Sequence, residues 1–465
     1  MVSTESPFLR RDARVHRATR SPMTTERLSS VDSTGLLAVH TFGLKLAGLV
    51  VATIGTVLVS RLLGPEGRGL YYTPVIAAAT IVTVAKLGLE QANVFLHGSR
   101  SISAERLAAQ ATFVALVGGS VGIVGMLGVA ALIPRVFGDV PLLLVVLAAL
   151  TIPISLHSQF ISGLQNLLGQ VTLQFRAAIV GGVVQLACLL ALWLTRSVTI
   201  AWVMGANLLG AVVAWFWTLR TSAVSPITFR WDPALMRETM GQSLVLHTGL
   251  VLFFLHLRVD AFMVKGINGA TALGIYSLAV VLAETVLLVT DSISIALLPR
   301  QVTVALKESA HVALVAARVN AYLALAFAIV VAATAWALIP LLFGAEFSGV
   351  YPALIALLPG IVFISMQRVC GPPVIRAGTP WRVTAIYAGS LVINVGLNLF
   401  LIPLLGPVGA SLSSSVSYGL AAIFFLAWTS SLAGSASALK PSLSDIQLVA
   451  QAAALGSKLV RRPAP

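Results

Sequence analysis

The sequence predicts an all-α integral membrane protein with about a dozen spanning helices. The 465-residue chain is 58% hydrophobic and only 10% charged, whereas a soluble domain carries roughly 25% charged residues. Apolar stretches of about 20 residues, the length that crosses a bilayer, recur from residue 36 to residue 432. Because backbone polar groups must be paired internally in hydrocarbon, we expect these stretches to be helices.

The expected helices follow one another through short connections. They cover residues 36–60, 70–97, 107–133, 140–164, 172–194, 199–219, 239–265, 271–298, 312–340, 351–375, 382–402 and 408–432. The polar residues 1–34 lack periodicity and are expected to form a disordered cytoplasmic tail. Residues 35–220 and 239–433 would form two six-helix lobes, joined by a cytoplasmic linker at 221–238. In the tail 434–465, spaced apolar residues suggest an interfacial helix.

Basic residues set the expected orientation. The formal net charge is +14, and most Lys and Arg residues lie in alternate connections between the predicted spans. The exceptions on the other side are Arg61, Arg68, Arg135, Arg196 and Lys265. Cytoplasmic loops carry an excess of Lys and Arg, so both termini are expected in the cytoplasm. This placement accounts for the positive charge without a nucleic-acid partner.

The two halves of the chain resemble each other. The segment Ala131–Pro134, followed by Phe137-Gly138, recurs 206 positions later as Ala337–Pro340, followed by Phe343-Gly344. Gly69-Leu70-Tyr71 matches Gly274-Ile275-Tyr276 at an offset of 205. An even number of spans in each half makes the repeats parallel. We therefore expect two six-helix lobes around a central cavity, an arrangement suited to alternating access.

Charges inside spans are the candidate functional residues, because each costs at least about 2.5–3.5 kcal/mol on insertion scales. The first half offers Lys45, Lys86 and Glu90. Lys86 and Glu90 are four residues apart, so they are expected to share a helix face. They form either a self-neutralising pair or part of a cavity wall. Lys45 lies near the end of its span, where its side chain can also reach the interface.

The second half offers five such charges: Arg258, Asp260, Glu284, Asp291 and Arg368. Arg258 and Asp260 are two residues apart, so they point to different faces and each needs another partner. Glu284 and Asp291 are seven residues apart and are expected on one stripe of their helix. Arg368 either faces the cavity or extends to the interface.

Other chemistries lack the residues that they need. His247 and His256 are nine residues apart, and no Cys or carboxylate cluster completes a metal site with them. No Walker-type Gly-rich loop is present. Cys188 and Cys370 both fall inside spans, where packing is their expected role. We therefore expect no metal and no cofactor.

Three motifs carry a family resemblance. The first is Ser60–Tyr71, which contains Leu63-Gly64-Pro65. The second is Arg258–Asp260, followed by Leu273–Ala279. The third is Asn398–Pro403, followed by Gly406–Ala410. In their order and placement these motifs resemble the bacterial polysaccharide flippase family, which translocates O-antigen and exopolysaccharide repeat units. That family lies within the multidrug/oligosaccharidyl-lipid/polysaccharide exporter superfamily.

The resemblance implies a flippase of the bacterial inner membrane that moves a polyprenyl-diphosphate-linked oligosaccharide between leaflets. An anionic diphosphate favours cationic partners, Arg above all. Substrate binding is therefore assigned to Arg258, Lys86, Arg368 and Lys45. Support of these cations, or ion coupling, is assigned to Asp260, Glu284, Glu90 and Asp291. The resemblance also allows a polysaccharide polymerase or another envelope-synthesis protein as partner.

Three alternatives remain at this stage. A cation-coupled multidrug exporter of the same superfamily would need an acidic residue in the N-terminal lobe, where Glu90 is the membrane candidate. A membrane enzyme acting on lipid-linked sugars would need a sizeable polar loop on the non-cytoplasmic side, but the predicted connections there are short. A scaffold within an envelope-synthesis complex would have no need of charges inside its spans. We therefore expect a transporter and no enzyme.

Overall fold

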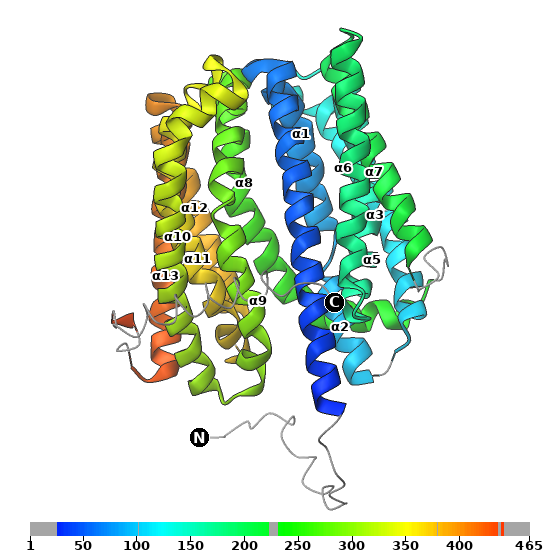
Figure 1. The fold of residues 1–465 in the computed structure, drawn as a ribbon, viewed down its shortest axis with the longest axis vertical. Coiled ribbons are helices and arrows are strands. Elements are labelled where there is room, and N and C mark those ends of the chain that lie inside the picture. The colour runs from blue at the N-terminus through cyan, green and yellow to red at the C-terminus, as the bar shows by residue number, and fades with distance from the viewer. Residues whose placement is uncertain (1–25, 101, 223–230, 379, 436–438, 441–465) are drawn as a thin grey trace, which may run out of the picture.

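The computed structural model describes residues 26–100, 102–222, 231–378, 380–435 and 439–440, and the regular structure of this part is entirely helical (Figure 1). The α-helices are α1 (Glu26–Ala85), α2 (Leu89–Arg100), α3 (Ala104–Leu132), α4 (Leu142–Ala149), α5 (Thr151–Leu167), α6 (Val171–Leu194), α7 (Ile200–Thr221), α8 (Pro233–Glu284), α9 (Leu287–Thr303), α10 (Leu306–Phe343), α11 (Val350–Arg376), α12 (Pro380–Leu405) and α13 (Pro407–Ala433). Two short 3-10 helices, η2 (Pro134–Val136) and η3 (Ala345–Phe347), lie in connections.

These helices make twelve membrane crossings in two lobes. Helix α1 contains two crossings that meet at Gly64, and α8 contains two that meet at Gly269. Helices α2 and α9 continue the second crossing of each, and α4 and α5 together form one crossing. The first six crossings end with α7 and form the N-terminal lobe, and the six that begin with α8 form the C-terminal lobe. Of the described helices, nine are long and apolar enough by composition alone to cross a membrane.

The two reversals are equivalent points of the repeat. Gly64 has φ 66° and ψ 179°, and Gly269, 205 positions later, has φ 83° and ψ −174°. A positive φ of this kind is open to Gly and strained for other residues. Pro65 follows Gly64 at the start of the next helix, where its fixed φ and missing N–H are tolerated. We call the end of the bundle that carries Gly64 and Gly269 the upper end (Figure 1).

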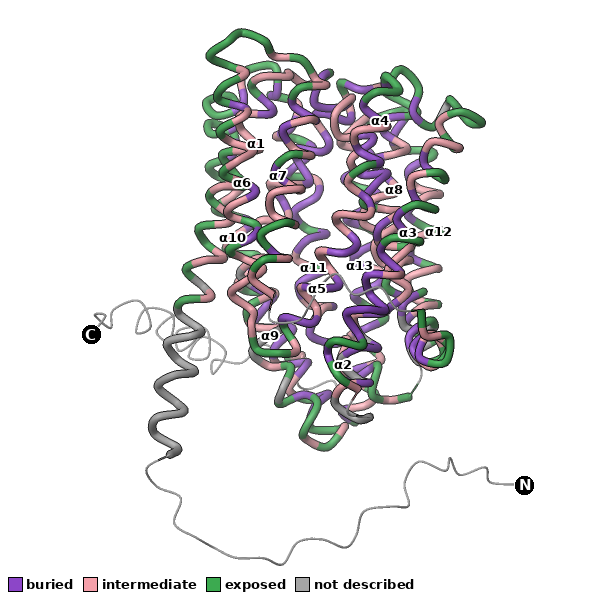
Figure 2. The backbone as a smooth tube through the Cα atoms, turned by 90° about the vertical axis from the view of Figure 1, so that its right-hand side faces the viewer, coloured by how far each residue is buried: buried purple, intermediate pink, exposed green. Residues whose placement is uncertain are grey.

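The lobes differ in how densely they pack. In the C-terminal lobe α11 and α13 are mostly buried, with 61% and 56% of their most apolar windows inside the protein. In the N-terminal lobe the crossings at the equivalent places of the repeat, α4 with α5 and α7, have 39% and 22% of such windows inside the protein. Figure 2 shows the buried residues concentrated along α11 and α13. Close approach in the N-terminal lobe depends on Gly181 and Gly210, whose backbones would clash with any added side chain.

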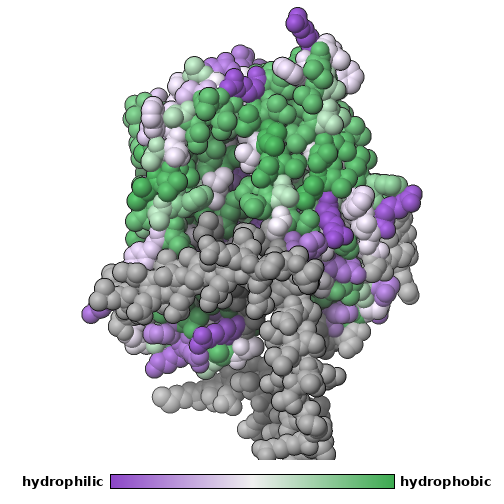
Figure 3. Space-filling view, in the orientation of Figure 1, coloured by the Kyte–Doolittle hydropathy of each residue, from purple (hydrophilic) through white to green (hydrophobic). Residues whose placement is uncertain are grey.

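The face shown in Figure 3 carries an apolar band with polar residues gathered at its ends. Exposed Val, Leu, Ile and Phe side chains are numerous on α3, α10 and α12. A soluble protein rarely exposes so continuous an apolar surface. The protein is therefore a multi-pass membrane protein, as its composition predicts.

Several expected boundaries are wrong. Helix α1 begins at Glu26, so residues 26–34 of the predicted disordered tail are helical. Helix α8 begins at Pro233, with Asp232 capping it, so the predicted linker 221–238 is shorter. These helices continue into segments rich in polar residues. A hydropathy pattern detects only the apolar part of a helix that lies inside the bilayer, so it does not predict these extensions. The remainder of the N-terminal tail and the predicted interfacial helix after residue 440 lie outside the described residues.

Candidate functional site: the chamber between the lobes

Two adjoining cavities are present: the upper one lies among helices of the N-terminal lobe and meets the C-terminal lobe at Val281, and the lower one lies between the N-terminal lobe and α8. The upper cavity has a volume of about 480 Å³, and its wall comes from α1, α6 and α7 with Val281 of the C-terminal lobe. The lower cavity has a volume of about 580 Å³ and is lined by α1, α2, α5, α7 and α8. Val75, Asn207 and Ala211 line both. We call the two together the chamber.

Lys86 and Glu90 line the lower cavity, as expected of a wall charge. Lys86 Nζ lies 3.3 Å from Glu90 Oε1, and the two side chains are 23% and 26% exposed. They do not share one continuous helix, because the chain breaks at 86–88, where Leu87 has φ 51° and Gly88 φ 73°. Lys86 and Glu90 thus form a half-buried ion pair across the helix break, and both side chains face the lower cavity.

The break at residues 86–88 also joins the two lobes. Carbonyl groups at and just before the break contact α8: Ser243 Oγ donates to Leu87 O at 2.9 Å, and the His247 ring lies 3.2 Å from Val84 O. An added Cβ on Gly88 would lie 2.7 Å from that of Ser243. Carbonyl groups freed by a helix break inside a membrane need such partners. The first part of α8 thus packs directly on the wall that carries Lys86.

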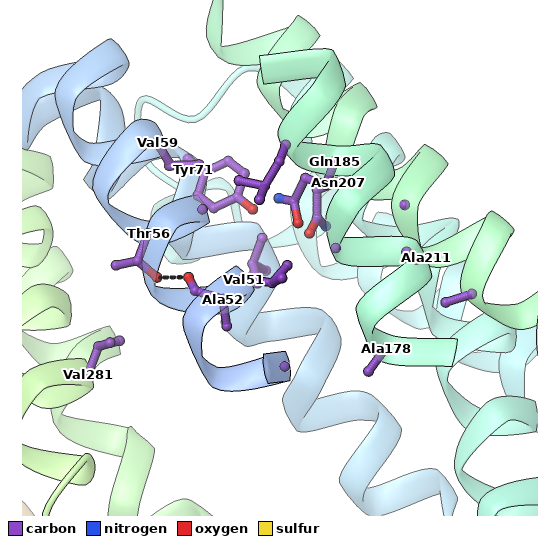
Figure 4. A pocket seen from close by; sticks show the side chains of 18 of the residues that line it. Val51, Ala52, Thr56, Val59, Tyr71, Ala178, Gln185, Asn207, Ala211 and Val281 are labelled. Atoms are coloured by element: carbon purple, nitrogen blue, oxygen red, sulfur yellow. Dashed lines mark hydrogen bonds between the residues drawn. The ribbon is translucent and has the colours of Figure 1, made fainter. Parts of the chain in front are cut away.

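The upper cavity holds neutral polar groups that the sequence analysis missed. Figure 4 shows the amides of Gln185 and Asn207 next to each other, with the hydroxyl end of Tyr71 pointing toward them. Arg68 also lines this cavity, is 5% exposed, and donates to Ser60 Oγ at 2.8 Å and Ser277 Oγ at 3.1 Å. Gln185 and Asn207 could have been found from the sequence as uncharged amides inside long apolar segments. The sequence analysis considered only charged residues inside the spans and therefore missed them.

The charges of the C-terminal lobe form two ion pairs. Arg258 binds Glu284 through two contacts, of 2.8 Å and 3.2 Å. Arg368 pairs with Asp291. Glu284 and Asp291 therefore do not share a stripe, because the helix is interrupted between Glu284 and Leu287 and each acid turns to its own partner. Neither Arg258 nor Glu284 lines the upper or the lower cavity.

Asp260 faces away from Arg258, as its spacing predicts, and is 1% exposed. Its carboxylate accepts hydrogen bonds from the hydroxyl of Tyr276, from Ser414 Oγ at 2.7 Å and from the N–H of Ala261 at 2.8 Å. Among the described residues it has no Lys or Arg within ion-pair distance. A buried carboxylate satisfied only by neutral donors is a candidate for proton or cation binding.

The polar network continues from Asp260 into α12 and α13. Asn394 Nδ2 lies 3.3 Å from Ser414 Oγ and 3.2 Å from Ser417 Oγ. The His256 ring lies 2.9 Å from Ser417 Oγ, and Asn398 donates to Asn394 Oδ1 at 2.9 Å. These side chains are all buried within the C-terminal lobe. Asp260 thus belongs to a dense polar core and does not line the chamber.

Lys45 is the remaining predicted site residue. It is half-buried on α1, one turn before Gly48, which lines the upper cavity. Lys45 itself lines neither cavity. No residue in the described part of the chain pairs with it.

Above the chamber the lobes are in contact. A Cβ added to Gly69 would lie 1.9 Å from Ala270 O, and one added to Gly274 would lie 1.8 Å from Pro65 O. The two contacts are related by the same offset of 205 positions, so the repeats approach each other symmetrically here.

Charged groups add to this upper contact. Arg61 donates to the carbonyl groups of Leu341 and Leu342, and Lys265 pairs with Asp139. The hydrogen bond from Lys265 holds the pKa of the Asp139 carboxyl below its ordinary value. These contacts and the glycine pair close the upper end of the chamber.

Comparison with known proteins gives the fold. No protein-family model and no curated protein sequence matches the chain. Among solved structures, an inward-facing multidrug resistance MATE family transporter of the MOP superfamily is similar, with TM-score 0.68 and 15% identity over 84% of this chain and 96% of that one. The lipid II flippase MurJ in an inward closed conformation has TM-score 0.65 and 12% identity over 92% and 94%.

A MOP superfamily transporter from Pyrococcus furiosus, described as having a binding pocket of reverse polarity, has TM-score 0.59 and 15% identity over 88% and 95% of the two chains. Identities this low speak for the fold alone. The chain therefore has the twelve-helix, two-lobe fold found in these transporters.

Proposed function

We propose that this protein is a translocator that moves polyprenyl-diphosphate-linked oligosaccharide repeat units across the bacterial inner membrane by alternating access. The observation that carries the proposal is the chamber, which lies between two lobes and has Lys86 in its wall. A bulky anionic headgroup needs such a water-accessible, cation-bearing space to cross hydrocarbon. The fold shared with transporters, including a lipid II flippase, supports it.

In this proposal the diphosphate binds near the Lys86–Glu90 pair. At 23% exposure the Lys86 ammonium group can exchange Glu90 for a phosphate oxygen without leaving the cavity wall. Arg258 itself lines neither cavity, but its neighbour Leu257 lines the lower one. Paired with Glu284, Arg258 would add positive charge behind this wall. Arg368 and Lys45 lie farther from the cavity walls and have secondary roles.

Asp260 would serve coupling. Proton or cation binding at its carboxylate would change the hydrogen bonds that link α8, α12 and α13. Because α8 also contacts the N-terminal lobe at both ends of the chamber, a rearrangement there can be transmitted to the opening between the lobes. Asp291 and Glu90 would remain partners of nearby cations.

The conformation described would be inward-facing. The upper end is closed by the glycine contacts and by the Lys265–Asp139 pair. With both termini cytoplasmic, the lower cavity would receive the headgroup from the cytoplasmic leaflet. Opening of the upper contact would then release it outside.

The proposal is tested with purified protein in liposomes that contain a fluorescent lipid-linked oligosaccharide. Appearance of the label in the opposite leaflet is measured by quenching. Wild-type protein is expected to move the lipid, and Lys86→Gln to slow the movement about tenfold, the equivalent of one charged hydrogen bond of roughly 1.4 kcal/mol. Arg237→Gln, which removes an exposed cation that lines neither cavity, is the matched control. Failure of wild-type protein to move the lipid would refute the proposal.

A second candidate is a cation-coupled exporter of drugs or other small molecules. The observation in its favour is Glu90, a carboxylate in the wall of the lower cavity. Export of a lipophilic cation that depends on Glu90, with no movement of the lipid-linked oligosaccharide, would establish it in place of the flippase.

A further inference from the structure

The upper cavity has a composition different from that of the lower one. Its only ionic lining residue is Arg68, and no acidic residue lines it in the part of the chain that the structure describes. Its other polar lining groups are Thr56, Tyr71, Tyr72, Gln185 and Asn207. The lower cavity, by contrast, carries both Lys86 and Glu90.

The amides in this cavity are available for a ligand. Within the described residues, neither Gln185 nor Asn207 makes a hydrogen bond to another side chain or to the backbone, and the same holds for the Tyr71 hydroxyl. All three are half-buried and come from three different helices, α6, α7 and α1. Figure 4 shows them converging on one point of the cavity. Polar groups placed deep in a membrane without partners are costly unless a ligand or water satisfies them.

Their chemistry selects the ligand class. An amide offers donors and an acceptor together, and a phenol donates and accepts through one oxygen, which matches a ligand rich in hydroxyl groups. Arg68 has no carboxylate partner among the described residues and would repel a cation. The volume of about 480 Å³ lies within the usual range for small-ligand sites.

We propose that the upper cavity is a glycan subsite, in which Gln185, Asn207 and Tyr71 bind hydroxyl groups of neutral sugar residues while the diphosphate stays in the lower cavity. This inference rests on the proposed function and adds to it where the sugar lies. Asn207 and Val75, shared by the two cavities, mark the junction between sugar and diphosphate. When the upper end of the chamber opens, the sugar residues would leave first and the diphosphate would leave after them.

The test measures dissociation constants on the full chain in nanodiscs with three probes. They are a short-chain polyprenyl diphosphate, the same lipid carrying a neutral hexose trisaccharide, and tetraphenylphosphonium. The wild-type protein is expected to bind the glycosylated lipid at least about tenfold more tightly than the bare lipid, the equivalent of about one good hydrogen bond to each of two amides.

Gln185→Leu is expected to remove most of this difference and to leave binding of the bare lipid unchanged. Gln185→Ala is measured beside it, so that a folding defect of the bulkier variant does not decide the result. Gln174→Leu, on the same helix but outside both cavities, loses only an exposed hydrogen bond to Asn166 and should bind both lipids like wild type. Size-exclusion profiles of all variants check the fold.

The outcomes separate the two proposals. Equal binding of bare and glycosylated lipid by the wild-type protein, or a difference that survives both Gln185 variants, overturns the glycan subsite and leaves the flippase proposal standing. Binding of neither lipid overturns both. Tetraphenylphosphonium binding that Gln185→Leu abolishes would identify a cation site here and overturn the subsite.

Discussion

The two lobes share a backbone plan and differ in what they enclose. Gly64 and Gly269 turn the chain in the same way, and Gly69 and Gly274 make the same contact from opposite sides. Between these fixed points the N-terminal lobe carries the upper cavity, where Gln185 and Asn207 have no hydrogen-bond partner among the described residues. The C-terminal lobe instead holds a network of hydrogen-bonded polar side chains around Asp260.

This difference suggests a division of labour. The repeat conserves the geometry that brings the lobes together, because both halves must meet at one symmetric contact. The interiors are free to diverge, and in the proposed function the N-terminal lobe would hold the cargo and the C-terminal lobe the coupling group. Each prediction below tests one side of that contrast.

The largest effect is expected for Asp260→Ala. The substitution leaves the hydroxyls of Tyr276 and Ser414 without their acceptor, and each buried unsatisfied donor costs about 1–3 kcal/mol. Thermal unfolding in detergent should show a clear loss of stability. Asn207→Ala, which removes a cavity-lining amide without a hydrogen-bond partner in the described part of the chain, should leave the unfolding temperature nearly unchanged. Equal decreases in unfolding temperature for Asp260→Ala and Asn207→Ala would contradict the proposed difference between the two lobes.

Gly69→Val should disrupt the symmetric upper contact. A Cβ at this position would lie 1.9 Å from the Ala270 carbonyl oxygen, and overpacking of this kind costs about 1–3 kcal/mol. We expect the closed upper end to open and lipid movement to slow about tenfold. The control is Gly128→Val, because a Cβ on Gly128 meets nothing within 4 Å. Normal transport by Gly69→Val would show that this contact is dispensable.

Substitutions at Arg258 distinguish a role in substrate binding from a purely structural role in the ion pair with Glu284. If Arg258 attracts the diphosphate as proposed, Arg258→Gln should lower surface polysaccharide about tenfold at equal protein level, the equivalent of one charged interaction of about 1.5 kcal/mol. The double variant Arg258→Glu with Glu284→Arg rebuilds the ion pair but moves its positive charge. Full recovery of polysaccharide in the double variant would assign the pair to folding alone.

Asp139 provides a small, pH-dependent effect. Its lowered pKa means that the Lys265 contact stabilises the folded protein above the ordinary carboxyl pKa of about 3.9 and is lost as pH falls through the lower folded value. The carboxylate is 60% exposed, so Asp139→Asn should cost only about 0.2–1 kcal/mol. The loss in unfolding temperature should be constant from pH 8 to pH 5 and should vanish in stronger acid. A loss that changes between pH 8 and pH 5 would point to another titrating group.

The sequence predicts the fold well because hydropathy and repeated motifs report on burial in lipid and on duplication. It also predicts that Arg258 and Asp260 need separate partners, and the structure supplies Glu284 for one and Tyr276 with Ser414 for the other. The sequence analysis missed the helix breaks at 86–88 and at Thr285-Val286. Gly88, with φ 73°, is a local signal for the first break, which also contacts a distant segment through Ser243 and Leu87. The second break contains neither Gly nor Pro.

The central claim is that a water-filled chamber between the lobes opens alternately to the two sides of the membrane. Asn207 lines both cavities, so Asn207→Cys, in a background with Cys188→Ala and Cys370→Ala, reports on that chamber through a membrane-impermeant thiol reagent. We predict labelling in inverted vesicles, where the cytoplasmic side is accessible, and new labelling from the opposite side when Gly69→Val is added. A cysteine protected from both sides, with and without Gly69→Val, would contradict the account.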